Sequence, residues 1–216
     1  MTGPLIVINP NSNEAVTEGL DSALAPFRLT GGPKIECVTL RDGPFGIQSQ
    51  LDSDSVILPL VNLVLSRKDA GAFVIACYSD PGLDACRSVT NRPVFGIQES
   101  GVLTAMARAD LFGVVAISEA SIVRHRRLMA RMNVLGRLAG EIALNITVDE
   151  SVRGDDTYVR LVDVCKALKK LGAGSIILGC AGLAVHRGKL EEELNLPVID
   201  PTLASVSMAL GTLLVK

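Results

Sequence analysis

The chain has 216 residues, of which 48% are hydrophobic and 20% charged, so it can bury a substantial core without a disulfide or metal scaffold. Its formal net charge of −2 and the shortness of its basic runs, such as residues 124–127, argue against a nucleic-acid partner. Because no signal peptide is recognisable and no apolar stretch approaches the roughly 18 residues that span a bilayer, we expect a cytoplasmic protein without a membrane partner.

Short, β-rich apolar segments alternate along the chain with longer segments of helical periodicity. This alternation predicts an α/β fold of parallel strands joined by right-handed helical crossovers. In chain order, we expect strands at Leu5–Ile8, Ile35–Leu40, Phe73–Ala76, Val94–Ile97, Phe112–Ile117, Ile142–Thr147, Ser175–Leu178 and Val198–Ile199. The expected helices lie near 13–25, 52–68, 81–90, 100–109, 119–131, 156–171, 183–194 and 202–214.

The sequence contains an internal repeat, in which residues 71–77 (GAFVIAC) align without a gap on residues 174–180 (GSIILGC). A Pro-Val pair follows the cysteine of each copy, 16 residues later at Pro93 and 17 residues later at Pro197. The repeat predicts two similar halves, each carrying a cysteine at the end of a buried strand.

We therefore predict two pseudo-symmetric lobes, each a short parallel sheet flanked by helices. The first lobe covers residues 1–98, with the C-terminal helix 201–216 packing back onto it, and the second covers residues 99–200. Ligands of open parallel sheets bind outside the carboxyl ends of the strands, where Cys77 and Cys180 are expected. Two facing lobes would place both thiols across one cleft, which is the predicted active site.

Five cysteines at irregular spacing, without an export signal, indicate free thiols and not a disulfide framework. Cys77 and Cys180 are the predicted catalytic residues, because repeat position, strand end and helix start coincide at both. A helix start after each thiol is expected to lower its pKa from about 8.5 toward neutrality. The strand and helix positions of Cys37, Cys86 and Cys165 are better explained by packing.

Polar or small residues near the ends of the predicted strands are candidate substrate contacts. Two follow the first cysteine, where Ser79 or Asp80 could also cap the next helix, and two small ones follow the second cysteine. Others lie in the first strand-to-helix turn, residues 9–14, and in the matching turn of the second lobe. The candidates are Asn13, Tyr78, Ser79, Ser118, Ala181 and Gly182.

Motifs for a nucleotide or metal are not found: the sequence has no GxGxxG, P-loop, CxxC or HxxxH pattern. We expect no metal and no cofactor. The two histidines are His125, which we place on the surface, and His186, which we keep as a pocket alternative. A nucleophilic pair of Cys180 with His186 stays open, although a separation of six residues does not bring two side chains onto one helix face.

Several of these segments together resemble the Asp/Glu/hydantoin racemase superfamily, most closely its hydantoin and allantoin racemase branch. The resemblance implies two lobes, no cofactor, and Cys77 and Cys180 acting as bases on opposite faces of a carbon acid. Ser79 and Leu183 depart from the Gly and Met common in that branch, which leaves the substituent of the substrate open. The resembling segments are VINPNSN at 7–13, ACYSDPGLDACR at 76–87 with PVFGI at 93–97, and ILGCAGL at 177–183 with PVID at 197–200.

By this resemblance the chain is expected to be an isomerase. It would be a cofactor-independent racemase that interconverts the enantiomers of a 5-substituted hydantoin or allantoin by proton transfer between two cysteines. Two alternatives remain: another cysteine enzyme of the superfamily, either an amino-acid racemase or a maleate-isomerase-like enzyme, and a non-catalytic two-lobed protein that binds a small molecule. We expect a small-molecule substrate and a homo-oligomer.

Overall fold

The computed structural model describes residues 3–153 and 156–215. Within them, the strands form two parallel four-stranded sheets with the orders β2-β1-β3-β4 and β6-β5-β7-β8, which confirms the predicted fold class. The first sheet contains β1 (Leu5–Asn9), β2 (Ile35–Thr39), β3 (Ala72–Ile75) and β4 (Val94–Gly96). The second contains β5 (Phe112–Ala116), β6 (Leu138–Ala143), β7 (Ser175–Leu178) and β8 (Val198–Ile199).

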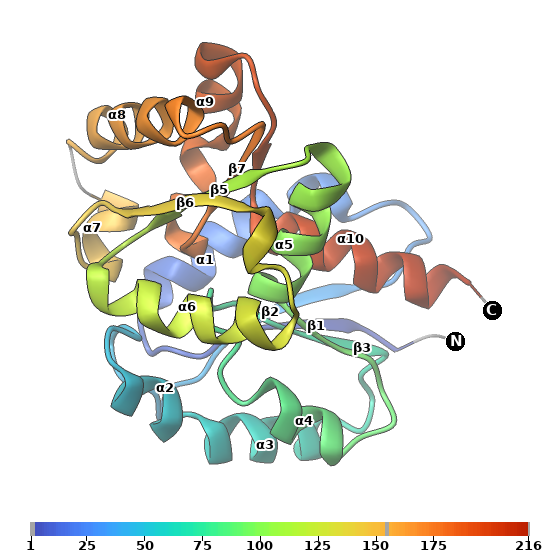
Figure 1. The fold of residues 1–216 in the computed structure, drawn as a ribbon. Helices are drawn as coiled ribbons and strands as arrows, with labels where there is room; N and C mark the ends of the chain where they lie inside the picture. Colours follow the sequence, from blue (N-terminus) through green and yellow to red (C-terminus); the bar gives the residue numbers. More distant parts are fainter. Residues whose placement is uncertain (1–2, 154–155, 216) are drawn as a thin grey trace.

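Helices cover the outer faces of both sheets and fill the space between them. Figure 1 shows α2, α3 and α4 below the first sheet, α8 and α9 beyond the second, and α1, α5 and α10 between the two. The α-helices are α1 (Glu14–Ala23), α2 (Gln50–Ser55), α3 (Ile57–Ser66), α4 (Leu83–Ser88), α5 (Ile97–Arg108), α6 (Glu119–Arg131), α7 (Val148–Arg153), α8 (Thr157–Lys170), α9 (Arg187–Leu194) and α10 (Pro201–Leu214). The 3-10 helices are η1 (Ala25–Phe27), η2 (Leu135–Arg137) and η3 (Ala181–His186).

The two central strands of the first sheet, β1 and β3, are buried along their whole length, and almost all of their residues are apolar. In β1, Ile6 and Ile8 pack into a smaller core with residues of α3 and α4. Leu5 and Val7 alternate with them and join a larger core, which continues through α1, α5 and α10 into the second sheet. The two sheets therefore share one continuous apolar interior.

The C-terminal helix α10 packs along α5 and contacts β3 and β4 of the first sheet. The expected boundary between residues 98 and 99 lies inside α5, which itself contacts β4, β5, β7 and β8. We keep the division into lobes at that position as a proposal. None of the helices in the described part of the chain has the length and apolar content needed to cross a membrane.

Several elements differ from the sequence-based expectations, and the helix expected at 183–194, for example, is η3 followed by α9. The helix expected at 52–68 is two helices, α2 and α3, which meet at Val56. Pro59 lies in the first turn of α3, where its missing N–H is tolerated, whereas it would interrupt a continuous helix. Strand β6 begins at Leu138, four residues before its expected start. Within it, Gly140 packs closely against Leu171, since a Cβ at that position would lie 2.8 Å from the Leu171 Cδ1 atom. The short helix α7 was not expected at all.

Candidate active site

Cys77 and Cys180 lie just beyond the carboxyl ends of β3 and β7, two strands that hold equivalent places in the two sheets. Both cysteines line the same pocket, which is partly open to solvent. A ligand in this pocket would therefore meet a sulfur atom from each half of the chain.

Four of the predicted substrate contacts line this pocket together with the cysteines: Tyr78, Ser79, Ala181 and Gly182. The wall is completed by Asn11, which lies in the candidate turn 9–14, and by residues that we did not propose as substrate contacts from the sequence. They come from the β1–α1 turn, from α1, from the loop before α2 and from α6 and α7. These residues include Asn11, Val16, Ile47, Ser121, Arg124, His125 and Val148.

The other two predicted contacts, Asn13 and Ser118, cap helices and are not among the described residues that line the pocket. The Asn13 Oδ1 atom accepts the Ala15 N–H, and its Nδ2 atom donates to Asp149 at 3.2 Å. The Ser118 hydroxyl accepts the Ser121 N–H at the start of α6. Both residues thus orient helices whose side chains form the wall.

A buried carboxylate caps α5 from a distance. Asp80 was a candidate cap for the helix that follows it, but that helix begins after Gly82 without a side-chain cap. The Asp80 carboxylate instead accepts the N–H groups of Gln98 and Glu99, at 2.8 and 2.9 Å. It thereby joins the turn after Cys77 to the first turn of α5.

In the second half of the chain, the corresponding helix α10 is capped by the residue directly before it and not by a residue from a distant turn. Asp200, the N-cap of α10, accepts the N–H groups of Thr202 and Leu203, the second and third residues of that helix. Gly96 holds the corresponding place before α5, and a Cβ built there would lie 2.2 Å from the Asp80 Cγ atom. A glycine is required at 96 because the carboxylate of Asp80 already occupies the space.

The expectation that helix starts lower the thiol pKa values is wrong. The pKa of Cys77 is raised to about 12, mainly by burial and to a smaller extent by the neighbouring Cys180, whereas Arg124 acts in the opposite direction. The pKa of Cys180 is also raised by burial, against opposing hydrogen bonds from Ser151 and the Gly182 N–H. Helix α4 starts only at Leu83, and η3 is a 3-10 helix, so no long helix dipole points at either sulfur.

Helix α7 brings a further polar group to Cys180. The Ser151 hydroxyl lies 3.5 Å from the Cys180 sulfur, within hydrogen-bonding range for sulfur. The helix begins with reciprocal contacts in which the Thr147 hydroxyl accepts the Glu150 N–H and the Glu150 carboxylate accepts the Thr147 N–H. The sequence Thr147-x-x-Glu150 is a capping-box pattern and would have revealed this helix.

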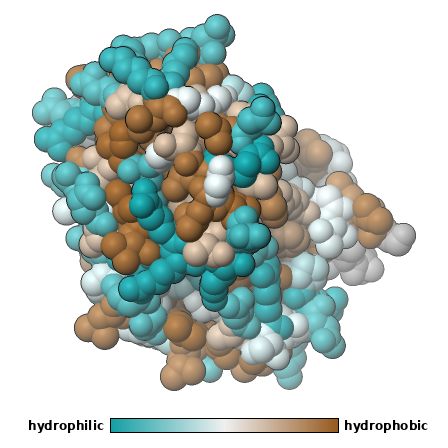
Figure 2. All heavy atoms as spheres, viewed as in Figure 1, coloured by the Kyte–Doolittle hydropathy of each residue, from teal (hydrophilic) through white to brown (hydrophobic). Residues whose placement is uncertain are grey.

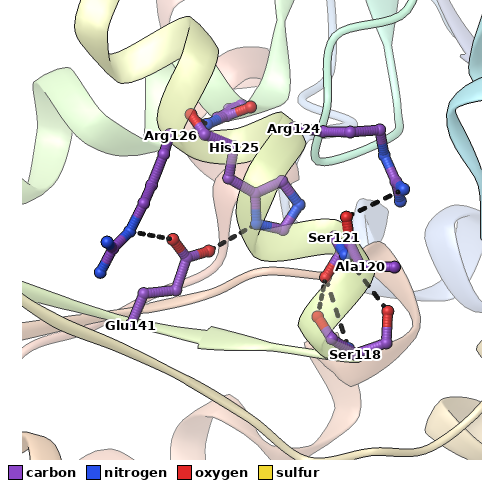
Figure 3. Close-up of polar contacts among 8 residues, drawn as sticks. Ser118, Ala120, Ser121, Arg124, His125, Arg126 and Glu141 are labelled. Atoms are coloured by element: carbon purple, nitrogen blue, oxygen red, sulfur yellow. Dashed lines mark hydrogen bonds and ion pairs between the residues drawn. The ribbon is translucent and has the colours of Figure 1, made fainter.

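His125, expected on the surface, is 1% exposed and lines the pocket. Its Nδ1 atom lies 2.6 Å from an oxygen of Glu141, and its ring meets the ring of Tyr78 edge-on at 4.8 Å between centroids. Figure 3 shows Glu141 and Arg126 on one side of the imidazole and Arg124 on the other. The His125 ring is thus held in place between a buried carboxylate and the residue that follows Cys77.

The second histidine and the three other cysteines lie outside the described lining of the pocket. His186 is half-buried against the Tyr158 ring and is absent from the described lining of the pocket. Cys86 and Cys165 are buried, and Cys37 is partly buried in the edge strand β2. Across residues 3–153 and 156–215, no group of three or more His, Cys, Asp and Glu side chains is placed to hold a metal ion.

Solved structures share this arrangement of two sheets. The allantoin racemase from Klebsiella pneumoniae has a TM-score of 0.90 at 29% identity, over 96% of this chain and 86% of that one. A glutamate racemase from Francisella tularensis, only 16% identical, has a TM-score of 0.71 over 98% of this chain and 81% of its own, and so shares the fold. The fold is that of the two-lobed α/β racemases.

Relatives that are similar in sequence identify the protein family to which the chain belongs. The family model described as Asp/Glu/Hydantoin racemase matches residues 5–209. A hydantoin racemase from Pseudomonas sp. (strain NS671) is 33% identical over 207 residues, covering 94% of this chain and 83% of the relative. A second, from Paenarthrobacter aurescens, is 32% identical over 212 residues, covering 95% and 89%. The chain belongs to the Asp/Glu/hydantoin racemase family, and it is an isomerase of the racemase type.

Proposed function

We propose that this racemase interconverts the enantiomers of a 5-substituted hydantoin or of allantoin by proton transfer between Cys77 and Cys180. The observation that carries the proposal is that the two cysteines follow equivalent strands and line one pocket. The hydantoin and allantoin racemases to which the chain is similar support this class of substrate. In both compounds the labile proton is bonded to a ring carbon between a carbonyl carbon and a nitrogen.

In the proposed reaction one cysteine starts as a thiolate and the other as a thiol. The thiolate takes the proton from the ring carbon, so that the C–H bond breaks, an S–H bond forms and the electron pair moves into the carbonyl as an enolate. The opposite thiol then donates its proton to the other face of that carbon and becomes the thiolate. The raised pKa of Cys77 makes its thiolate a strong base but keeps the thiolate scarce in the ligand-free protein near neutral pH, and a general base works best when its pKa lies near the working pH.

We further propose that the four predicted contacts beside the cysteines border the bound ring, where hydroxyl and backbone N–H groups would stabilise the enolate oxygen. Asn13 and Ser118 would act indirectly, through the helices that they cap. The four bordering residues are Tyr78, Ser79, Ala181 and Gly182.

The test uses Cys77→Ser and Cys180→Ser in deuterated solvent. Each variant should lose racemisation, because the proton must leave through one sulfur and return through the other, and a serine hydroxyl is too weak an acid to replace a thiol. Each should still exchange deuterium into one enantiomer, and the two variants should prefer opposite enantiomers. Cys37→Ser, which changes a cysteine outside the pocket, is the matched control and should retain racemisation.

Exchange of the same enantiomer by both variants, or racemisation by either at nearly the wild-type rate, would contradict the two-base mechanism. Polarimetry on a panel of hydantoins, allantoin and free amino acids tests the substrate class, and we expect turnover of the ring compounds. Turnover of free amino acids alone, or a covalent adduct on one cysteine, would favour the other cysteine enzymes of the family.

A further inference from the structure

A groove lined by arginines adjoins the pocket on the side of α6. It encloses about 590 Å³, including space open to solvent, and two of its residues, Ser79 and Arg124, also line the pocket. A substituent that leaves the pocket past these two residues would enter the groove. Figure 2 shows a hydrophilic strip across this face of the molecule, over α6. The groove is lined by Gln50, Ser53, Ser79, Arg124, Arg127, Leu128 and Arg131.

The three arginines lie on one face of α6, since residues three, four and seven apart are neighbours on a helix. Each one contacts a group across the groove or near it. Arg124 donates to the Gln48 carbonyl oxygen at 3.1 Å, and Arg127 to the Gln50 side-chain oxygen at 3.1 Å. Arg131 pairs with Asp84 at 3.0 Å. Arg124 also donates to the Ala120 carbonyl oxygen at 3.3 Å. A guanidinium has five N–H donors, so these contacts still leave donors on each arginine for a ligand.

The charge of this face is incompletely balanced. Arg124 is 8% exposed, and its Nε atom has no hydrogen-bond partner. Among the described residues, no carboxylate lies within ion-pair distance of Arg124 or Arg127. Asp52 acts on Arg124 from a longer range, but its carboxylate accepts the Gln48 and Ser49 N–H groups. A buried cation with an unused donor is costly unless an anion is bound beside it.

We propose that Arg124 and Arg127 form a subsite for a carboxylate at the end of the substrate's side chain, while the ring of the substrate lies between the two cysteines. This inference rests on the proposed function, since it names the class of hydantoin that the same pocket accepts. Guanidinium groups bind carboxylates through paired, charge-assisted hydrogen bonds, which a neutral amide of the same shape does not reproduce. The subsite therefore selects for charge and not for size.

The test compares two racemic ligands that differ only in that charge, 5-(2-carboxyethyl)hydantoin and 5-(2-carbamoylethyl)hydantoin. Calorimetry should give at least about tenfold tighter binding of the carboxylate to the wild-type protein. This preference should fall as the ionic strength rises, because salt screens the attraction. In Arg127→Gln the ratio of the two dissociation constants should move toward one. Arg92→Gln, which removes an exposed arginine outside the pocket and the groove, should keep the wild-type ratio.

Ligand binding tests the proposed carboxylate subsite, and racemisation tests the proposed function. Equal binding of the two ligands, no binding of the carboxylate, or an unchanged ratio in Arg127→Gln would overturn the subsite. Racemisation of both ligands with equal affinities would leave the proposed function standing without the subsite. Tight, salt-sensitive binding of the carboxylate without racemisation of either ligand would support the subsite and contradict the proposed function.

Discussion

The Nδ1 atom of His125 lies 2.6 Å from an oxygen of Glu141, and the two side chains are 2% and 0% exposed. Such a pair is costly to bury, and it is tolerated only while both partners are present. The second oxygen of Glu141 has no hydrogen-bond partner, and its nearest cation is Arg126 at 3.9 Å. The pair holds the imidazole in the pocket wall against Tyr78.

Glu141→Ala should therefore destabilise the fold by about 3 kcal/mol, since it leaves His125 buried without its partner. Arg126→Gln removes the distant and largely exposed cation instead, and it should change the stability by less than about 1 kcal/mol. Urea denaturation measures the change in the free energy of unfolding for both variants. The double variant Glu141→Ala/His125→Ala should lose less than the sum of the two single losses. Equal losses for Glu141→Ala and Arg126→Gln would show that the buried pair has no special role.

The raised thiol pKa predicts a distinctive pH dependence for alkylation. Only the thiolate reacts, and the pKa of Cys77 is about 12, well above the ordinary value of about 8.5. Alkylation of Cys77 in the ligand-free protein should rise about tenfold per pH unit from about pH 7 to 10 without reaching a plateau. A small free thiol, measured in parallel by mass spectrometry, should begin to level off near pH 9. A plateau for Cys77 below pH 8 would indicate that local charges outweigh burial.

Asp80 should make stability depend on pH in an unusual direction. Burial raises the pKa of Asp80 from 3.8 to about 7, against the opposing effect of its two backbone hydrogen bonds. The folded chain then binds more protons than the unfolded chain between about pH 4 and 7, so this contribution to stability falls as the pH rises through that window. Compared with Asp80→Asn, the wild type should lose up to about 4 kcal/mol across it. Urea denaturation of both at several pH values tests this, and parallel curves would contradict it.

Helices α5 and α10 are capped by carboxylates at different positions, and this difference predicts how stability changes when the cap of α5 is moved from residue 80 to residue 96. Asp80→Ala should lose about 2 kcal/mol, because two N–H groups of α5 lose their acceptor. Gly96→Asp should be worse, since the new side chain would collide with the Asp80 carboxylate. The double variant Asp80→Ala/Gly96→Asp copies the arrangement of Asp200, and it should be more stable than either single variant. Thermal unfolding ranks the three proteins, and a double variant no better than Gly96→Asp would show that the halves are not equivalent here.

Most strands could be located from the sequence because the central ones, such as β1 and β5, are apolar on both faces and bounded by polar turns. The edge strand β6, which contains Glu141, begins four residues before its expected start. The repeat also predicted that two cysteines share one pocket, since equivalent strands of two similar halves end in equivalent places. Both inferences depend on local patterns, and tertiary packing did not reverse them.

The misplaced residues depend on packing that local patterns do not report. His125 lies in a run of arginines and was placed on the surface, although Ser121, His125 and Leu128 recur at helical spacing and are all buried. The thiol pKa values were expected to follow helix starts, but burial dominates them. Val148 and Ser151 were missed because α7 was not recognised before the second cysteine segment.

The helices that surround the two sulfur atoms cross between the halves of the chain. Helix α1 precedes Cys77 in sequence but packs against η3, which follows Cys180. Helix α6 follows β5 but reaches Tyr78, next to Cys77, through His125. A movement that separated the two sheets would therefore let water reach both thiols at the same moment. Because burial raises the pKa of both thiols, such a movement would lower the basicity of both sulfur atoms together.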